Sequence, residues 1–217
     1  MRLVNIMKAL CLLFLASLAA FSQPFSFGVK GGMPLTNFIE VASAQNINAS
    51  TTTNRYIVGL TGELRLPFGL GVEADILYRH FSYAAIGGTS GITTTSSTVD
   101  TTSGAWEFPL LAKYRFKGKI FRPFVDAGVA WDRLSGLTQT VTRTVAGITG
   151  STTTSNPAEL ANNTTIGYVL GGGMDVKVLI IHISPEVRFT RWGNQHLMSS
   201  LANSKQNQAE FLVGITF

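Results

Sequence analysis

Apolar and polar side chains alternate along eight segments of the chain, and the last segment shows the pattern most clearly. Its apolar side chains occupy every odd position: Ala209, Phe211, Val213, Ile215 and Phe217. Successive side chains of a β-strand point to opposite faces, so this segment is expected to be a strand with one apolar face. The same alternation predicts strands at 25–33, 55–66, 70–83, 105–116, 120–134, 164–177, 180–192 and 208–217.

The connections between these strands alternate in length. Three are short turns, at 67–69, 117–119 and 178–179, and four are long loops, at 34–54, 84–104, 135–163 and 193–207. Each strand can reach the roughly 9 to 11 residues that a tilted strand needs to cross the hydrocarbon layer. Short turns on one rim and long loops on the other are typical of membrane barrels. We therefore predict an all-β fold, an eight-stranded antiparallel up-and-down transmembrane β-barrel, whose closure leaves no backbone group unpaired in lipid.

The alternation alone does not say which face of the barrel is apolar. A soluble, ligand-carrying barrel of eight strands alternates equally well, with its apolar face turned inward. A membrane barrel is favoured by the alternation of loop lengths, by aromatic residues at the ends of the apolar face, and by the final Phe217. The aromatic residues near the long loops, where an interfacial belt is expected, are Tyr78, Trp106, Trp131 and Tyr168.

Charged residues fall on the opposite face, which the alternation turns into the barrel. The acidic ones are Glu63, Glu73, Asp75, Glu107, Asp126, Asp132, Asp175, Glu186 and Glu210. The basic ones are Lys30, Arg65, Arg79, Lys113, Arg115, Arg122, Lys177 and Arg188. Eight strands enclose a lumen that side chains can fill, so nine acids and eight bases predict a structural network of ion pairs. The alternative is a narrow ion or small-solute channel, with water in gaps left by interior glycines such as Gly128 and Gly171.

The first residues resemble a secretory signal. Arg2 and Lys8 precede an apolar stretch at 9–19, which is too short to span a bilayer, and small residues follow at 20–22. We expect residues 1–22 to be removed and 23–217 to form one barrel domain. The only cysteine, Cys11, lies in the signal, which excludes disulfides and cysteine metal sites from the remainder. The remaining 15 basic and 12 acidic residues give a formal charge of +3, too small to indicate a nucleic-acid partner.

Three segments carry a resemblance to a known family. They are Glu107–Phe116 (EFPLLAKYRF), Arg122–Gly128 (RPFVDAG) and Ser184–Phe189 (SPEVRF). They resemble the small eight-stranded outer-membrane β-barrel family, which includes the membrane domain of outer membrane protein A and the OmpX-like barrels. The resemblance implies a place in the outer membrane of a Gram-negative-type bacterium, among its lipids. It also implies that the assembly machinery reads the strand ending at Phe217.

Catalysis is weighed because some barrels of this size modify lipids. His182 and Ser184 have the His-x-Ser spacing of a lipid A deacylase, but they lie beside a short turn and face the lumen. Asp75 and His80 are five residues apart, so they point to opposite faces of one strand. We expect His196, in the last long loop, to be a solvated loop residue. The sequence thus predicts no catalytic, cofactor-binding or metal-binding residue and no enzyme.

The long loops at 84–104 and 135–163 are rich in threonine and serine. Threonine favours extended backbone, so two hairpins could continue past the membrane as a protruding sheet that captures a foreign strand. The other reading is flexible loops that shield the barrel. We expect a monomer with a mainly structural role and with adhesion or partner binding through these loops. The rivals are a narrow channel and a lipid-modifying enzyme.

Overall fold

The structure is a computed structural model that describes residues 25–37, 39–41, 47–89, 95–158, 160–198 and 202–217. The predicted signal at 1–22 lies outside the described residues. The strands are β1 (Phe25–Pro34), β2 (Ile39–Val41), β3 (Ile47–Arg65), β4 (Leu70–Thr89), β5 (Thr95–Arg115), β6 (Phe121–Val145), β7 (Ile148–Thr154), β8 (Thr164–Val178), β9 (Ile181–Trp192), β10 (Ala202–Ser204) and β11 (Asn207–Thr216). A three-residue 3₁₀ turn, η1 (Pro67–Gly69), joins β3 to β4.

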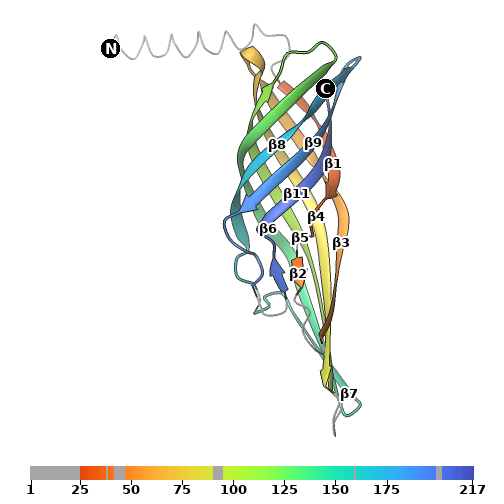
Figure 1. The fold of residues 1–217 in the computed structure, drawn as a ribbon. Coiled ribbons are helices and arrows are strands. Elements are labelled where there is room, and N and C mark those ends of the chain that lie inside the picture. Colours follow the sequence, from red (N-terminus) through yellow and green to blue (C-terminus); the bar gives the residue numbers. More distant parts are fainter. Residues whose placement is uncertain (1–24, 38, 42–46, 90–94, 159, 199–201) are drawn as a thin grey trace, which may run out of the picture.

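Eight long strands close into the predicted antiparallel barrel (Figure 1). Each pairs with its neighbour in the chain or across a short insertion, and β1 pairs with both β3 and β11. The register at the closure joins Val29 to Ile215 on one side and to Leu60 on the other. The described part of the chain contains no helix long and apolar enough to cross a membrane.

The outer wall of the barrel is apolar and the inner wall is charged. Phe27 and Leu170 are 66% and 63% exposed, whereas the side chains of Lys30 and Arg188 are buried. On the outer wall, Tyr78 packs on Trp106 with ring centroids 5.0 Å apart, near the end of the barrel that carries the long loops. A soluble ligand-carrying barrel would have the reverse arrangement, so the structure agrees with the membrane interpretation.

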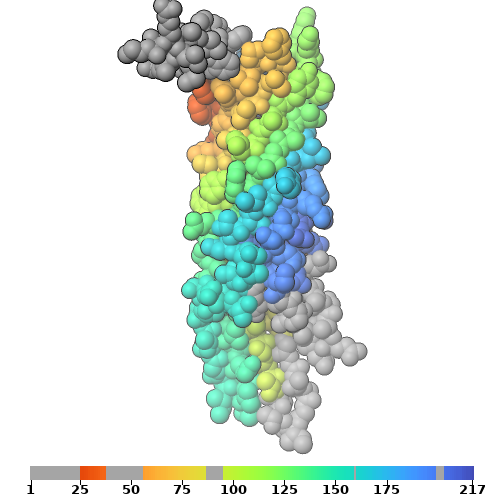
Figure 2. Space-filling view, turned by 90° about the vertical axis from the view of Figure 1, so that its left-hand side faces the viewer, coloured from red at the N-terminus to blue at the C-terminus, as the bar shows by residue number. Residues whose placement is uncertain are grey.

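Strands β3 to β6 are longer than the sequence predicts. The alternation placed strand limits at 55, 83, 105 and 134, but β3 starts at Ile47, β4 ends at Thr89, β5 starts at Thr95 and β6 ends at Val145. Most of the predicted loops at 84–104 and 135–163 is therefore strand, and β7 adds a further strand beside β6. The described residues of these segments thus form the protruding sheet that the threonine-rich sequence suggests. In Figures 1 and 2 this sheet extends the barrel into an elongated column.

Two bulges mark the height at which the barrel becomes the protruding sheet. One interrupts the pairing of β3 between Thr53 and Ile57, and the other interrupts β5 between Thr102 and Gly104. Both lie beside Arg79 and His80 of β4, which pair with Ile57 and Gly104 respectively. Bulges increase the local twist and bend a strand. They allow the same strands to follow the barrel wall on the side of the short turns and to leave it on the side of the protruding sheet.

Candidate functional site

The charged side chains inside the barrel form three groups along its axis. The first, here called the turn-end group, lies near the short turns and contains Glu63, Arg115, Asp175 and His182. Arg115 binds the carboxylate of Glu63 with both terminal nitrogens and donates from Nε to Asp175 Oδ2 at 3.1 Å. His182 Nδ1 lies 2.7 Å from Asp175 Oδ1. The carboxylate of Asp175 thus joins an arginine from β5 to a histidine from β9.

The central group crosses the whole lumen. Its members are Lys30, Glu73, Asp75, Lys113, Glu186 and Arg188. Lys30 Nζ lies 3.0 Å from Asp75 Oδ2 and 3.2 Å from Glu186 Oε2. Arg188 donates to the same two carboxylates, at 3.0 Å and 2.7 Å, and is fully buried. These contacts connect β1, β4 and β9 through the lumen rather than along the wall.

The loop-end group is centred on Arg79. This arginine forms ion pairs with Glu107 at 3.4 Å, with Glu210 at 3.0 Å, and with Asp132. Its guanidinium carbon also lies 6.0 Å from the centroid of the Trp192 ring. Three carboxylates therefore surround one guanidinium, and a histidine joins them from outside the barrel strands.

That histidine is His196, and our expectation that it is a solvated loop residue was wrong. It is 2% exposed, with Nε2 3.1 Å from Asp132 Oδ2 and Nδ1 2.7 Å from the Asn162 carbonyl oxygen. The segment after β9 folds inward and carries His196 onto the loop-end group. The residues next to His196 in the sequence give no signal of this burial, because Asp132 approaches from β6.

An apolar cluster lies next to the loop-end group, on the side of the long loops. It consists of Phe81, Tyr83, Ala105, Leu134 and Leu197, with Leu160 packed against it. Phe81 and Leu197 are essentially unexposed. Sequence reasoning missed this cluster, although the inward parity of Phe81, Tyr83 and Leu134 could have indicated three of its members.

Two of the predicted interior bases lie at the rim instead. Lys177 is exposed, and Arg122 is half-buried and donates from Nε to the Gly118 carbonyl oxygen at 3.1 Å. Both residues occupy positions of their strands that face inward. They lie so close to the short turns, however, that their side chains are at the rim and not in the lumen. Arg65 is also near the rim, with its Nη2 3.3 Å from Ser26 Oγ. All nine predicted acids are buried, so acid exceeds base inside the barrel.

The interior glycines on which the channel alternative depends are closely approached by their neighbours. A Cβ added at Gly128 would overlap the Leu110 carbonyl oxygen, and one at Gly171 would overlap the Asp126 carboxylate. Neighbouring backbone and charged side chains already occupy the space that a larger residue would need. Within the described ranges, no group of three or more histidines and carboxylates is arranged to hold a metal ion.

The protruding sheet presents a different surface from the lumen. On the β6–β7 hairpin, hydroxyl pairs join the two strands, Thr140 with Thr153 at 3.1 Å and Thr144 with Thr149 at 2.9 Å. Among the described residues, β7 pairs with β6 alone, and its side chains are exposed from Ile148 to Thr153. The far side of β7 is therefore an open strand edge.

Comparison with protein families identifies the barrel. Residues 21–193 match the model of the outer membrane protein beta-barrel domain. The chain belongs to this family. Membership places the protein in the outer membrane and agrees with the apolar outer wall. No curated protein sequence matches the chain.

Solved structures with similar shape include three small outer-membrane proteins. Neisserial surface protein A is 11% identical, with 89% of this chain and 96% of that chain covered and a TM-score of 0.45. OprG of Pseudomonas aeruginosa is 13% identical, with coverages of 88% and 92% and a TM-score of 0.48. Ail, the attachment invasion locus protein of Yersinia pestis, is 8% identical, with coverages of 89% and 96% and a TM-score of 0.33.

Proposed function

We propose that this outer-membrane barrel has a structural role in the membrane and binds an extracellular partner by adding a strand of that partner to β7. In the orientation that we propose, the short turns face the periplasm and the protruding sheet faces the outside of the cell. The observation that carries the proposal is the open edge of β7, which pairs with β6 alone among the described residues. An unpaired edge offers a row of backbone donors and acceptors to another chain.

The sequence of β7 lacks the features that normally protect an edge strand. Proteins block open edges with charged residues, proline or bulges. Residues 148–154 read Ile-Thr-Gly-Ser-Thr-Thr-Thr, with no charge and no proline, and their pairing with β6 is regular from Ile148 to Thr154. Threonine also favours the extended backbone that strand addition requires. An unprotected edge on a sheet held away from the membrane supports a binding role.

A selection of peptides tests this proposal. A displayed library of random peptides is selected on the folded protein in nanodiscs, and the enriched peptides are tested on Ser151→Pro and Thr152→Pro. Successive N–H groups of a strand point in opposite directions, so one of these prolines removes a donor from the open edge and the other removes a donor facing β6. We expect the edge-blocking variant to lose the peptides while it keeps the barrel. The absence of enriched peptides, or their equal binding to both variants, contradicts the proposal.

The charged lumen supports a structural rather than a conducting or catalytic role. We propose that Glu63, Arg65, Glu73, Asp75, Arg79, Glu107, Lys113, Arg115, Asp126, Asp175, Glu186, Arg188 and Glu210 hold the barrel strands together. Ion pairs such as Lys30–Asp75 and Arg79–Glu210 join side chains of different strands and restrain these strands relative to one another. His182 pairs with Asp175 inside the lumen, away from any acyl chain, which supports the absence of catalysis.

The secretion and assembly steps are part of the same proposal. We propose that residues 1–22 direct export, that 23–217 fold as one monomeric domain, and that Phe217 is the signal for the assembly machinery. Phe217 is 63% exposed, and its N–H donates to the Phe27 carbonyl oxygen at 3.0 Å. Deletion of Phe217 should lower the amount of heat-modifiable protein in outer membranes, while Phe217→Tyr should preserve it. Equal assembly of the deletion variant would contradict the assembly role.

A further inference from the structure

The periplasmic rim combines basic and apolar residues and lacks acid. The turns at 66–70, 116–121 and 178–180 contain Lys117 and Lys119 but no aspartate or glutamate. The same turns expose large apolar side chains, with Phe68 92% exposed and Leu179 88% exposed. Apolar side chains beside cations suit an interface between hydrocarbon and anionic headgroups.

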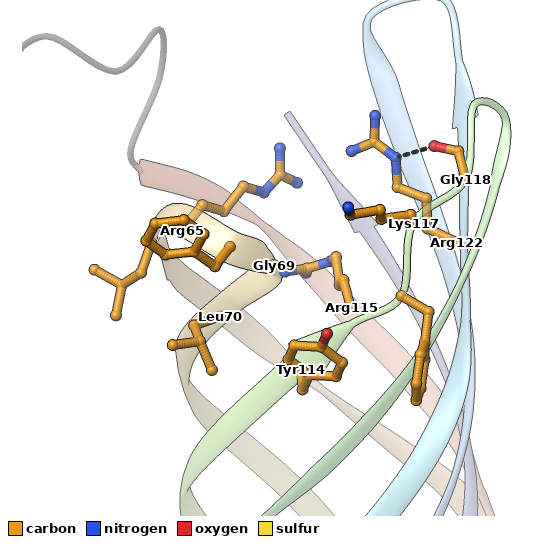
Figure 3. Close-up of a pocket in the computed structure, with 11 residues that line it drawn as sticks. Arg65, Gly69, Leu70, Tyr114, Arg115, Lys117, Gly118 and Arg122 are labelled. Carbon is orange, nitrogen blue, oxygen red and sulfur yellow. Dashed lines mark hydrogen bonds between the residues drawn. The ribbon is translucent and has the colours of Figure 1, made fainter.

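A hollow lies between the β3–β4 turn and the β5–β6 turn on this rim. It has a volume of about 430 Å³ and is lined by Arg65, Tyr114, Phe116, Lys117 and Arg122, among others. Figure 3 shows the cationic ends of Arg65, Lys117 and Arg122 gathered above the space between the two turns. Tyr114 and Leu70 lie lower in that view, on the wall of the barrel.

Only some cations of the hollow take part in the ion pairs of the lumen, and Arg65 is one of them, with its Nε 4.0 Å from Glu63 Oε1. Arg115 is occupied by Glu63 and Asp175, whereas Arg122 uses only Nε, on the Gly118 carbonyl oxygen. Among the residues that the structure describes, Lys117 and the terminal nitrogens of Arg122 have no acidic partner. The positive charge of Lys117 and Arg122 therefore favours an anion at this site.

We propose that this hollow binds the phosphate headgroup of an anionic phospholipid from the periplasmic leaflet. The proposal rests on the orientation in the proposed function, in which the short turns face the periplasm. Lys117 and Arg122 donate to the phosphate oxygens, and Arg65 adds positive charge from β3. The acyl chains lie along Leu70, Tyr114 and Phe116, which are between 42% and 49% exposed on the outer wall. Phosphate and acyl chains are thus held by adjoining surfaces.

The geometry of the turns fixes this arrangement. A Cβ at Gly118 would overlap the Phe121 carbonyl oxygen, so only glycine fits where the Gly118 carbonyl accepts from Arg122. Gly69 has a φ of 84° and approaches the backbone of Arg115. The approach of Gly118 to Phe121 shapes the β5–β6 turn, and that of Gly69 to Arg115 sets the β3–β4 turn against the end of β5. The cations are therefore positioned before a lipid arrives.

The experiment measures which lipids stay bound to the folded protein. Nanodiscs with equal parts of phosphatidylglycerol and phosphatidylcholine are dissolved in mild detergent, and retained lipid is identified by native mass spectrometry. We expect phosphatidylglycerol to be retained preferentially. The K117Q/R122Q variant should retain roughly twentyfold less of it, since each cation near an anionic surface contributes a factor of about five. Equal retention by this variant would overturn the site.

A matched control separates the site from the net charge. The R133Q/R143Q variant removes the same charge from two exposed positions of β6 far from the short turns, and it should keep the lipid preference. Equal losses in both double variants would mean that overall charge attracts the lipid, and they would overturn the proposal. Excess inorganic phosphate should not displace the lipid, and complete displacement would contradict the part assigned to the acyl chains. Heat-modifiable migration and peptide selection at β7 report separately on the barrel and on the proposed function.

Discussion

The lumen and the protruding sheet share several strands, yet the lumen buries charged side chains whereas the sheet exposes an uncharged strand edge. Inside the barrel, Arg79 and Arg188 are each surrounded by carboxylates, all of them from other strands for Arg79, and from both β4 and its own strand β9 for Arg188. In the protruding sheet, β7 has no charged residue and one neighbour. A closed wall can bury charge because most of its charges have partners across the lumen, although both carboxylate oxygens of Asp126 lack a hydrogen-bond partner. An open edge can bind because its backbone has partners on one side only.

The largest difference between the two regions should appear when an arginine is removed from each. Arg188→Met removes one of the two cations that pair with Asp75 and Glu186 and leaves Lys30 as the cation they share. Breaking a buried pair by removing one partner costs about 3 to 5 kcal/mol. Arg143→Met, on the exposed part of β6, should change stability by less than about 0.5 kcal/mol. Urea unfolding in lipid vesicles, followed by tryptophan fluorescence, measures both. Equal costs would mean that the lumen network does not stabilise the barrel.

Arginine introduced on the outside gives the next effect. Leu170 pairs with Ala127 and Phe189 near the middle of β8 and is exposed on the outer wall. Leu170→Arg should cost about 2 to 4 kcal/mol if this position lies near the bilayer midplane. Thr152→Arg on β7 should cost almost nothing, because the protruding sheet lies in water. A well-folded Leu170→Arg variant would show that this wall does not face lipid.

Removing the link between the last long loop and the lumen should have a smaller effect. His196→Ala removes one partner of Asp132, which keeps Arg79, and the side-chain partner of the Asn162 carbonyl oxygen. A buried group left unsatisfied costs about 1 to 3 kcal/mol. Limited proteolysis should then cut the 193–206 segment faster, while heat-modifiable migration is retained. His80→Ala, at a half-buried position of β4, is the control and should leave proteolysis unchanged. Unchanged cleavage of His196→Ala would mean that the histidine does not hold this segment.

The smallest effect is expected in the β6–β7 hairpin. Thr149→Ala removes one of the two cross-strand hydroxyl pairs, and such a pair contributes roughly 0.2 to 1 kcal/mol. Hydrogen exchange should rise in residues 141–154 and stay the same in the barrel strands. Increased exchange throughout the barrel would show that the two regions unfold together rather than independently.

The sequence predicts the barrel well because one physical rule governs every membrane strand. Period-two alternation identified all eight barrel strands and placed residues such as Glu73 and Arg188 inside. The alternation did not predict the strands of the protruding sheet, where no lipid imposes this rule. The threonine-rich ends of β5 and β6 have little apolar alternation, so their lengths were underestimated, and β7 was not predicted.

The remaining misses differ in whether the local sequence contained a signal for them. The β6–β7 turn did carry a local signal, since Ala146 and Gly147 both have positive φ and glycine is typical of such two-residue hairpins. The burial of His196 and Leu197 had no local signal, because Asp132, Phe81 and Leu134 come from other strands. Lys177 and Arg122 show the limit of the alternation argument. It predicts the face to which a side chain points, but not whether the residue lies inside the lumen or at its rim.

The most direct test of the contrast between a filled lumen and an open edge is the conductance of folded monomers in planar bilayers. The ion pairs around Lys30 and Arg79, together with the apolar cluster of Phe81 and Leu197, occupy the lumen along its axis. An eight-stranded barrel filled in this way should show no steady conductance. Reproducible, porin-sized conductance from monomers would contradict the account.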